Sequence, residues 1–83
     1  MSIIEEVKAV LDENLALGGR GRGFTAATEL FGALPELDSF AVVGLVAALE
    51  SRFGIQLADD DINLESFGSV GALTALVEMK LAR

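Results

Sequence analysis

Ser39 is the residue whose type and position come closest to supporting chemistry. It follows Asp38 and stands directly before a run from Phe40 to Leu49 that contains no charged or strongly polar side chain. Aspartate and serine are both favoured N-cap residues, so a helix is predicted to begin here. A serine at such a position can act as a nucleophile if a base activates it, or it can simply cap the helix. Whether Ser39 is a nucleophile or only a helix cap depends on whether the chain supplies an activating base.

An activating base for Ser39 is not evident in this sequence. The chain contains no His and no Cys, which removes the commonest general base, the commonest metal ligand and any thiolate nucleophile. Its carboxylates cluster in segments that we expect to be solvated, where no apolar environment would retune them for acid–base work. We therefore expect no independent enzymatic activity.

One acidic segment has a spacing that resembles the start of a calcium-binding loop. Alternate positions from Asp59 to Glu65 carry a carboxylate or an amide. A calcium loop would then require Gly where Leu64 stands and Glu where Val70 stands. No specific metal site is predicted.

Glycine and arginine alternate between residues 18 and 23, in the order Gly-Gly-Arg-Gly-Arg-Gly. A phosphate-binding loop would be followed by Lys and then Ser or Thr at the start of a helix, which this segment lacks. Two arginines in a chain with a net charge of −7 also make a poor nucleic-acid site. We expect a mobile surface loop, whose arginines contact acidic residues of a partner or of the same domain.

The acidic residues concentrate in the middle of the chain. From Glu36 to Glu65 there are seven acidic residues and one basic residue, Arg52. This asymmetry disfavours nucleic acid and anionic membranes and favours basic partner surfaces, although a solvated acidic face would give the same pattern. No apolar run approaches the length of a membrane span, and the first residues lack the basic start of a signal peptide. We therefore predict a cytoplasmic protein without membrane insertion.

The helix signals predict a single all-α domain over residues 1–83. Apolar periodicity predicts longer helices over residues 2–15, 39–53 and 70–82, and a brief further helix that opens at Asp59. Together these elements predict a small four-helix bundle of three longer helices and one short helix.

The connections between these helices carry their own signals. Gly18 and Gly19 are expected to end the first helix. Thr25 is expected to cap a short helical turn that runs to Phe31 and pins the long connection before Pro35 to the core. Apolar positions expected to face the core include Val42, Leu45, Val46, Leu49, Phe53, Leu64, Phe67, Val70, Leu73, Leu76, Val77 and Leu81.

The triplet from Asp38 to Phe40 resembles the attachment site of the acyl carrier proteins, whose hallmark is Asp-Ser-Leu at the start of the second helix. The run over residues 45–55 is also similar to that family, as are the chain length and the order of the helices. In acyl carrier proteins the serine carries a 4′-phosphopantetheine arm, whose thiol holds acyl groups as thioesters. The resemblance implies this covalent cofactor on Ser39, where the N–H groups and dipole of the helix would tolerate a phosphodiester.

The resemblance also implies partners for a carrier that works as a monomer. These are a phosphopantetheinyl transferase, and an acyl-activating ligase, acyltransferase or synthase with a basic docking surface. The residues expected to contact them are Asp38, Phe40, Val43, Ala47 and Glu50. Phe40 replaces the family's usual Leu, while Ala41, Gly44 and Ser51 stand where fatty-acid carriers often have acids. These departures favour a specialised carrier over the housekeeping protein.

Two alternatives remain open at this point. A peptidyl or aminoacyl carrier of a synthetase system would use the same arm and differ only in its partner enzymes. A cofactor-free interaction module would instead insert the exposed helix into a groove of another protein. In the first case Ser39 carries the cofactor, and in the second it only caps its helix.

Overall fold

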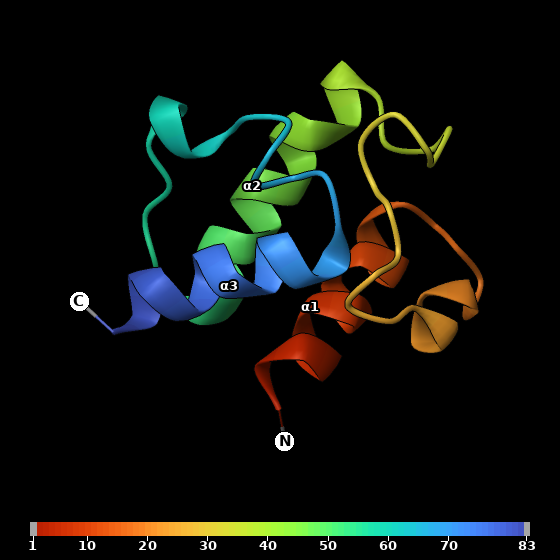
Figure 1. The fold of residues 1–83 in the computed structure, drawn as a ribbon, viewed down its shortest axis with the longest axis horizontal. Coiled ribbons are helices and arrows are strands. Elements are labelled where there is room, and N and C mark those ends of the chain that lie inside the picture. The colour runs from red at the N-terminus through yellow and green to blue at the C-terminus, as the bar shows by residue number, and fades with distance from the viewer. Residues whose placement is uncertain (1, 83) are drawn as a thin grey trace.

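Three α-helices and two short 3₁₀ turns make up the computed structural model, which describes residues 2–82. The helices are α1 (Ile3–Asn14), α2 (Ser39–Phe53) and α3 (Val70–Leu81), and the turns are η1 (Arg20–Gly23) and η2 (Asp59–Asp61). α1 packs against both α2 and α3 (Figure 1). The predicted all-α class is confirmed, with the short fourth helix reduced to the single turn η2.

Each α-helix begins at a residue whose side chain accepts a hydrogen bond from the backbone N–H three residues further on. These N-caps are Ser2, Asp38 and Ser69, and the donor–acceptor distances are 3.4, 2.8 and 3.1 Å. α2 ends at Gly54, which adopts the left-handed conformation with a φ of 65°. The predicted bounds of α2 are correct because such capping signals are local in the sequence.

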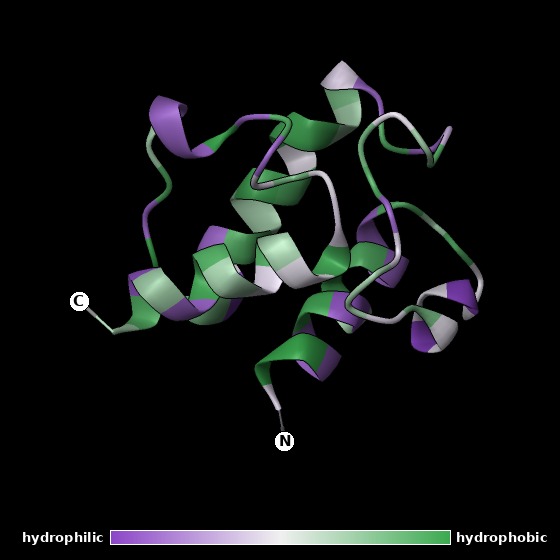
Figure 2. Ribbon diagram, in the orientation of Figure 1, coloured by the Kyte–Doolittle hydropathy of each residue, from purple (hydrophilic) through white to green (hydrophobic). Residues whose placement is uncertain are grey.

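The three helices enclose one apolar core. Its largest fully buried side chains are Phe67, Leu11, Leu30, Leu45, Leu49, Leu73, Val7, Val10, Val70 and Val77. Hydrophobic residues cover most sides of α2, whereas α1 alternates between hydrophobic and hydrophilic stretches (Figure 2). Because a domain of this size cannot bury a helix all round, part of the apolar surface of α2 remains outside the core.

Two leucines that were predicted to lie in the core are on the surface. Leu64 is 69% exposed, whereas Phe67, which was also predicted to lie in the core, is only 2% exposed. The N–H of Phe67 donates to the carbonyl of Asn63 and closes the turn that contains Leu64. Leu81 is 41% exposed, whereas Val77 on the preceding turn is fully buried. The apolar periodicity of α3 thus runs one turn further than the core that covers it.

The predicted loop after α1 is instead held against that helix. Ala16, rather than Gly18, is the first residue after α1 in the left-handed conformation, with a φ of 53°. The carboxylate of Asp12 accepts the N–H groups of Gly19 and Gly21 at 3.2 and 2.8 Å. A Cβ on Gly21 would lie 2.9 Å from Asp12 Cβ, so the close approach of η1 to α1 requires glycine there.

Backbone hydrogen bonds pin the long connection between η1 and α2. The helical turn predicted from Thr25 to Phe31 is reduced to one hydrogen-bonded turn, in which the N–H of Thr28 donates to the carbonyl of Thr25 at 3.0 Å. The N–H of Leu30 donates to the carbonyl of Gly68 at 2.8 Å, and the N–H of Phe31 donates to Phe67 at 3.1 Å. The side chain of Leu30 is fully buried. The connection is therefore pinned as expected, but through a pairing with residues far along the chain.

Candidate functional site

Ser39 is the first residue of α2, and its side chain is exposed. Asp38 occupies the capping position, since its Oδ1 accepts the N–H of Ala41 at 2.8 Å. Within residues 2–82 the Ser39 hydroxyl makes no hydrogen bond. From the sequence, either Asp38 or Ser39 could have capped α2. In the structure Asp38 is the cap, and the Ser39 oxygen is accessible from solvent.

The start of α2 is a favourable place for an anion. The first N–H groups of an α-helix have no intrahelical acceptor, and the helix dipole adds partial positive charge at this end. Asp38 accepts one of these N–H groups and leaves the others of the first turn available. A phosphodiester formed on the Ser39 oxygen would lie where the backbone can donate hydrogen bonds to it.

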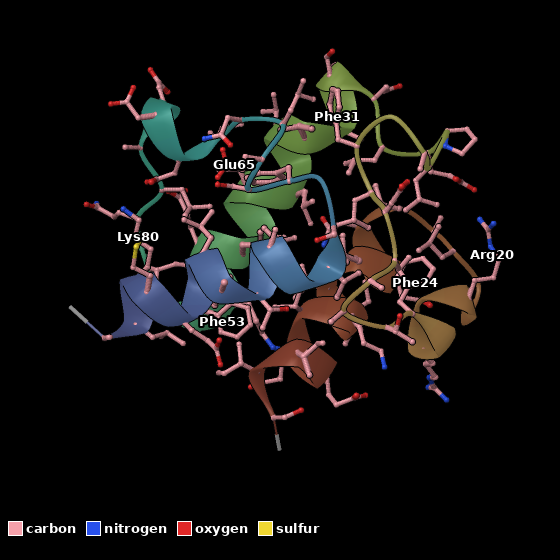
Figure 3. All side chains as sticks on the ribbon, in the orientation of Figure 1. Arg20, Phe24, Phe31, Phe53, Glu65 and Lys80 are labelled. Carbon is pink, nitrogen blue, oxygen red and sulfur yellow. The ribbon has the colours of Figure 1, made fainter. Side chains whose placement is uncertain are left out.

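An apolar pocket of about 260 Å³ opens directly beside Ser39. Besides Ser39, its lining residues are Phe31, Val42, Ile62, Asn63, Leu64 and Phe67. They come from three parts of the chain: the connection before α2, the first turns of α2, and the segment after η2. Figure 3 shows Phe31 beside the N-terminal part of α2. The pocket offers apolar volume within reach of any group attached to Ser39.

Three of the predicted partner-contact residues share one exposed face of α2. Phe40 is 89% exposed, Val43 is 71% exposed and Ala47 is also exposed. Their spacing of three and four residues places them on the same side of the helix. Asp38 is exposed at the N-terminal end of this face. We call these four residues the α2 face.

Glu50 has a structural contact that the sequence did not predict. Its side chain is half-buried, and Oε2 accepts the N–H of Leu57 at 2.8 Å. This bond fixes the extended link that follows Gly54 against the C-terminal part of α2. A contact between Glu50 and a partner stays a prediction, but one of its oxygens is already engaged within the fold.

An ion pair joins η1 to the residues just before the site. Arg20 donates to the carboxylate of Glu36, and Figure 3 shows Arg20 at the edge of the molecule. This hydrogen bond lowers the pKa of the Glu36 carboxyl below its ordinary value. Arg20 therefore contacts an acidic residue of its own domain, which was one of the two predicted outcomes.

Two classes of feature are missing from residues 2–82. No group of three or more acidic side chains is arranged so that it could hold a metal ion. No helix in the same range is long and apolar enough to cross a membrane.

The family described as “Phosphopantetheine attachment site” matches residues 3–77. The chain belongs to this family. It is 33% identical over 81 residues to the acyl carrier protein of Thermotoga maritima, and the matched region covers 95% of this chain and 91% of that protein. Its fold matches the solution NMR structure of a holo acyl carrier protein from Nitrosomonas europaea, with a TM-score of 0.91 and 41% identity over the full length of both chains.

Membership of this family confirms several predictions from the sequence. The resemblance to acyl carrier proteins, the acyl carrier function without enzymatic activity and the phosphopantetheine prosthetic group all agree with these relatives. Membership also implies contacts with a phosphopantetheinyl transferase and with synthases or transferases in general. The attachment residue and the partner-contact residues stay predictions.

Proposed function

We propose that Ser39 carries the 4′-phosphopantetheine arm and that the chain presents acyl thioesters on it to partner enzymes. One observation carries the assignment of this residue: Ser39 begins α2 with an exposed hydroxyl, while Asp38 alone caps the helix. A serine that capped its own helix would hold its oxygen against the backbone. Ser39 instead presents its oxygen to a transferase.

The residues around Ser39 suit this role. The N-terminal N–H groups of α2 would donate hydrogen bonds to the phosphodiester, and the adjoining pocket offers apolar surface for the attached group. When bound, the arm supplies the thiol that holds the acyl group, so the chain needs no cysteine of its own. The frame formed by the three helices keeps Ser39 at a fixed position on the surface.

For the partners, we propose that the α2 face and Glu50 form the contact surface. Phe40 and Val43 supply exposed apolar area, while Asp38 and Glu50 supply negative charge at its two ends. The matching partners are the transferase and an acyl-activating ligase, acyltransferase or synthase with basic groups around an apolar centre. The exposed apolar area of the α2 face suits a specialised carrier. We further propose that the chain is a single carrier domain that works as a monomer in the cytoplasm.

The alternative cargo is an aminoacyl or peptidyl group, which the same arm would hold. A cofactor-free interaction module has no support from the family match, because that family is defined by the attachment site. The choice between cargoes lies with the partner enzymes.

The test is an intact-mass measurement after incubation with coenzyme A and a broad-specificity phosphopantetheinyl transferase. We expect one added phosphopantetheine on the native chain and none on Ser39→Ala. Ser69→Ala is the matched control, since Ser69 also stands at a helix start but caps α3, and it should still accept the group. Addition to Ser39→Ala, or loss of addition in Ser69→Ala alone, would contradict the assignment.

A further inference from the structure

Leu64 is an exposed leucine at the edge of the pocket that Ser39 also lines. It is 69% exposed, and it stands in a turn among the polar residues Asn63, Glu65 and Ser66. A single exposed leucine needs no explanation, but apolar side chains gathered around one point of a surface mark an interaction site. We propose that Leu64 is a contact for the phosphopantetheinyl transferase, and that burial of its side chain strengthens the complex in which the arm is attached.

This inference rests on the proposed function, since it concerns the enzyme that loads Ser39. In that reaction the Ser39 oxygen forms a bond to the phosphorus next to the pantetheine of coenzyme A. The pyrophosphate bond breaks, the adenosine bisphosphate part of coenzyme A leaves, and the transferase takes up the serine proton. Because the reacting atoms must come into contact, the transferase has to cover the residues that border Ser39. Later partners react with the thiol at the far end of the arm and do not need to approach those residues.

Apolar surface borders Ser39 on both sides. Successive residues of an α-helix are turned by about 100°, so Val43 points about 40° to one side of Ser39 and Val42 about 60° to the other. Val43 belongs to the exposed α2 face, where Phe40 is 89% exposed. Val42 lines the pocket, and Leu64 lines the same pocket from the segment after η2. A transferase positioned over Ser39 therefore meets the α2 face on one side and Leu64 on the other.

The turn that carries Leu64 is held by hydrogen bonds that do not involve the leucine side chain. Asn63 Oδ1 accepts the N–H of Ser66 at 2.8 Å, and the Asn63 backbone carbonyl accepts the N–H of Phe67 at 3.0 Å. Phe67 is 2% exposed and anchors the turn in the core. Leu64 is thus presented from a turn that is already fixed, which lowers the entropic cost of a contact.

The neighbours of Leu64 and Ser39 define what the transferase must present to this surface. Glu65 follows Leu64 and is exposed, and Asp38 stands just before Ser39 and is also exposed. An apolar side chain with acidic neighbours fits an apolar recess surrounded by basic groups, because such a surface covers the leucine while it pairs with the carboxylates.

The experiment measures how tightly the transferase binds the carrier, apart from the chemical step. Ser39→Ala should accept no arm, so it competes with the native chain for the transferase, and its inhibition constant reports binding alone. Leu64→Gln and Leu64→Met are each combined with Ser39→Ala as competitors. Loading of the native chain by a broad-specificity transferase with coenzyme A is followed by intact mass. Glutamine keeps the length of the side chain but makes it polar, whereas methionine keeps it apolar.

Leu81→Gln, also combined with Ser39→Ala, is the matched control. Leu81 is 41% exposed at the C-terminal end of α3, which lies well away from the start of α2 in Figure 1. We expect Leu64→Gln to raise the inhibition constant about five- to tenfold, in line with the burial of most of a leucine side chain. Leu64→Met and Leu81→Gln should bind as Ser39→Ala alone does. When the single variant Leu64→Gln is loaded, the KM for the carrier should rise while kcat and the KM for coenzyme A stay unchanged.

An unchanged inhibition constant for Leu64→Gln would overturn the inference and leave Leu64 to the later partners. Equal weakening by Leu64→Met or by Leu81→Gln would also overturn it, as would a Tm for Leu64→Gln below that of the native chain, which would assign the loss to the fold. A native dimer in sedimentation that Leu64→Gln separates into monomers would assign Leu64 to a second copy instead. Failure of the native chain to accept the arm would contradict the proposed function rather than this contact.

Discussion

Alanine substitutions at the starts of α2 and α3 should distinguish Ser39 from the two residues that cap these helices, Asp38 and Ser69. Ser69 Oγ accepts the N–H of Ala72 at 3.1 Å, and Asp38 Oδ1 accepts the N–H of Ala41 at 2.8 Å. Loss of such an N-cap typically costs about 1 kcal/mol. Ser39 has no such bond within the described residues. Ser39→Ala should therefore leave the free energy of unfolding unchanged, or raise it by about 0.3 kcal/mol because alanine has the higher helix propensity.

Thermal unfolding followed by far-UV circular dichroism measures these differences. For a domain of this size, 1 kcal/mol corresponds to a shift in Tm of about 4–8 °C. Ser69→Ala and Asp38→Ala should therefore both melt several degrees below the native chain, while Ser39→Ala should melt at the native temperature or slightly above it. All three variants change one exposed or half-buried position and leave the core intact.

A Tm for Ser39→Ala as low as that for Ser69→Ala would refute this reasoning. It would mean that the Ser39 hydroxyl holds the start of α2, and that it is not available for modification without loss of stability. A native Tm for Asp38→Ala would refute the complementary claim that Asp38 is the cap.

Three further predictions follow from the structure. A Cβ on Gly68 would lie 2.5 Å from the backbone oxygen of Leu64, which lines the pocket. Gly68→Ala should therefore displace this segment and lower the free energy of unfolding, measured by denaturant titration, by about 1–3 kcal/mol. An unchanged free energy of unfolding would show that the segment moves aside at no cost. A Cβ on Gly44 would meet nothing within 4 Å, so Gly44→Ala should raise the free energy of unfolding by about 1 kcal/mol, and a loss of partner binding in that variant would show that a partner approaches the backbone there. Glu50→Gln keeps an acceptor for the Leu57 N–H, whereas Glu50→Ala does not. In thermal unfolding, only Glu50→Ala should therefore be destabilised, by about 1 kcal/mol. A weaker partner complex with Glu50→Gln would report the loss of the charge alone.

Helix positions were predictable because their signals lie within a few residues of each other. Asp38 and Gly54 bracket α2, and Ser69 opens α3, in each case through contacts of three or four residues in sequence. The errors arose where distant segments decide the outcome. Leu64 has the hydropathy of a core residue, yet it is exposed in the turn between Asn63 and Phe67, of which only Phe67 is buried. Its polar neighbours on both sides were the available signal for an exposed turn.

The site was predictable only in part for the same reason. The motif at Ser39 is local and can be read directly, whereas the pocket beside it draws on Phe31, Val42 and residues 62–64. These segments come together because the backbone of residues 30–31 pairs with that of residues 67–68. No periodicity within any one segment encodes that pairing. The hydrogen bond between Glu50 and the N–H of Leu57 could not be predicted for a different reason. The sequence does not indicate which N–H group a glutamate side chain on a helix will accept.

The apolar character of α2 follows from the three different surroundings along its sides. Leu45 packs in the core, Val42 and Ser39 border the pocket, and Phe40 and Val43 face solvent. A helix that served only to stabilise the bundle would carry polar residues on its third side, because an exposed aromatic ring gains nothing from the hydrophobic effect. Apolar residues on both the pocket side and the solvent side agree with the function we propose, in which one side would adjoin the attached group and the other would contact a partner. The same helix therefore supports the fold, lines the pocket and carries the contact surface that we propose for partners.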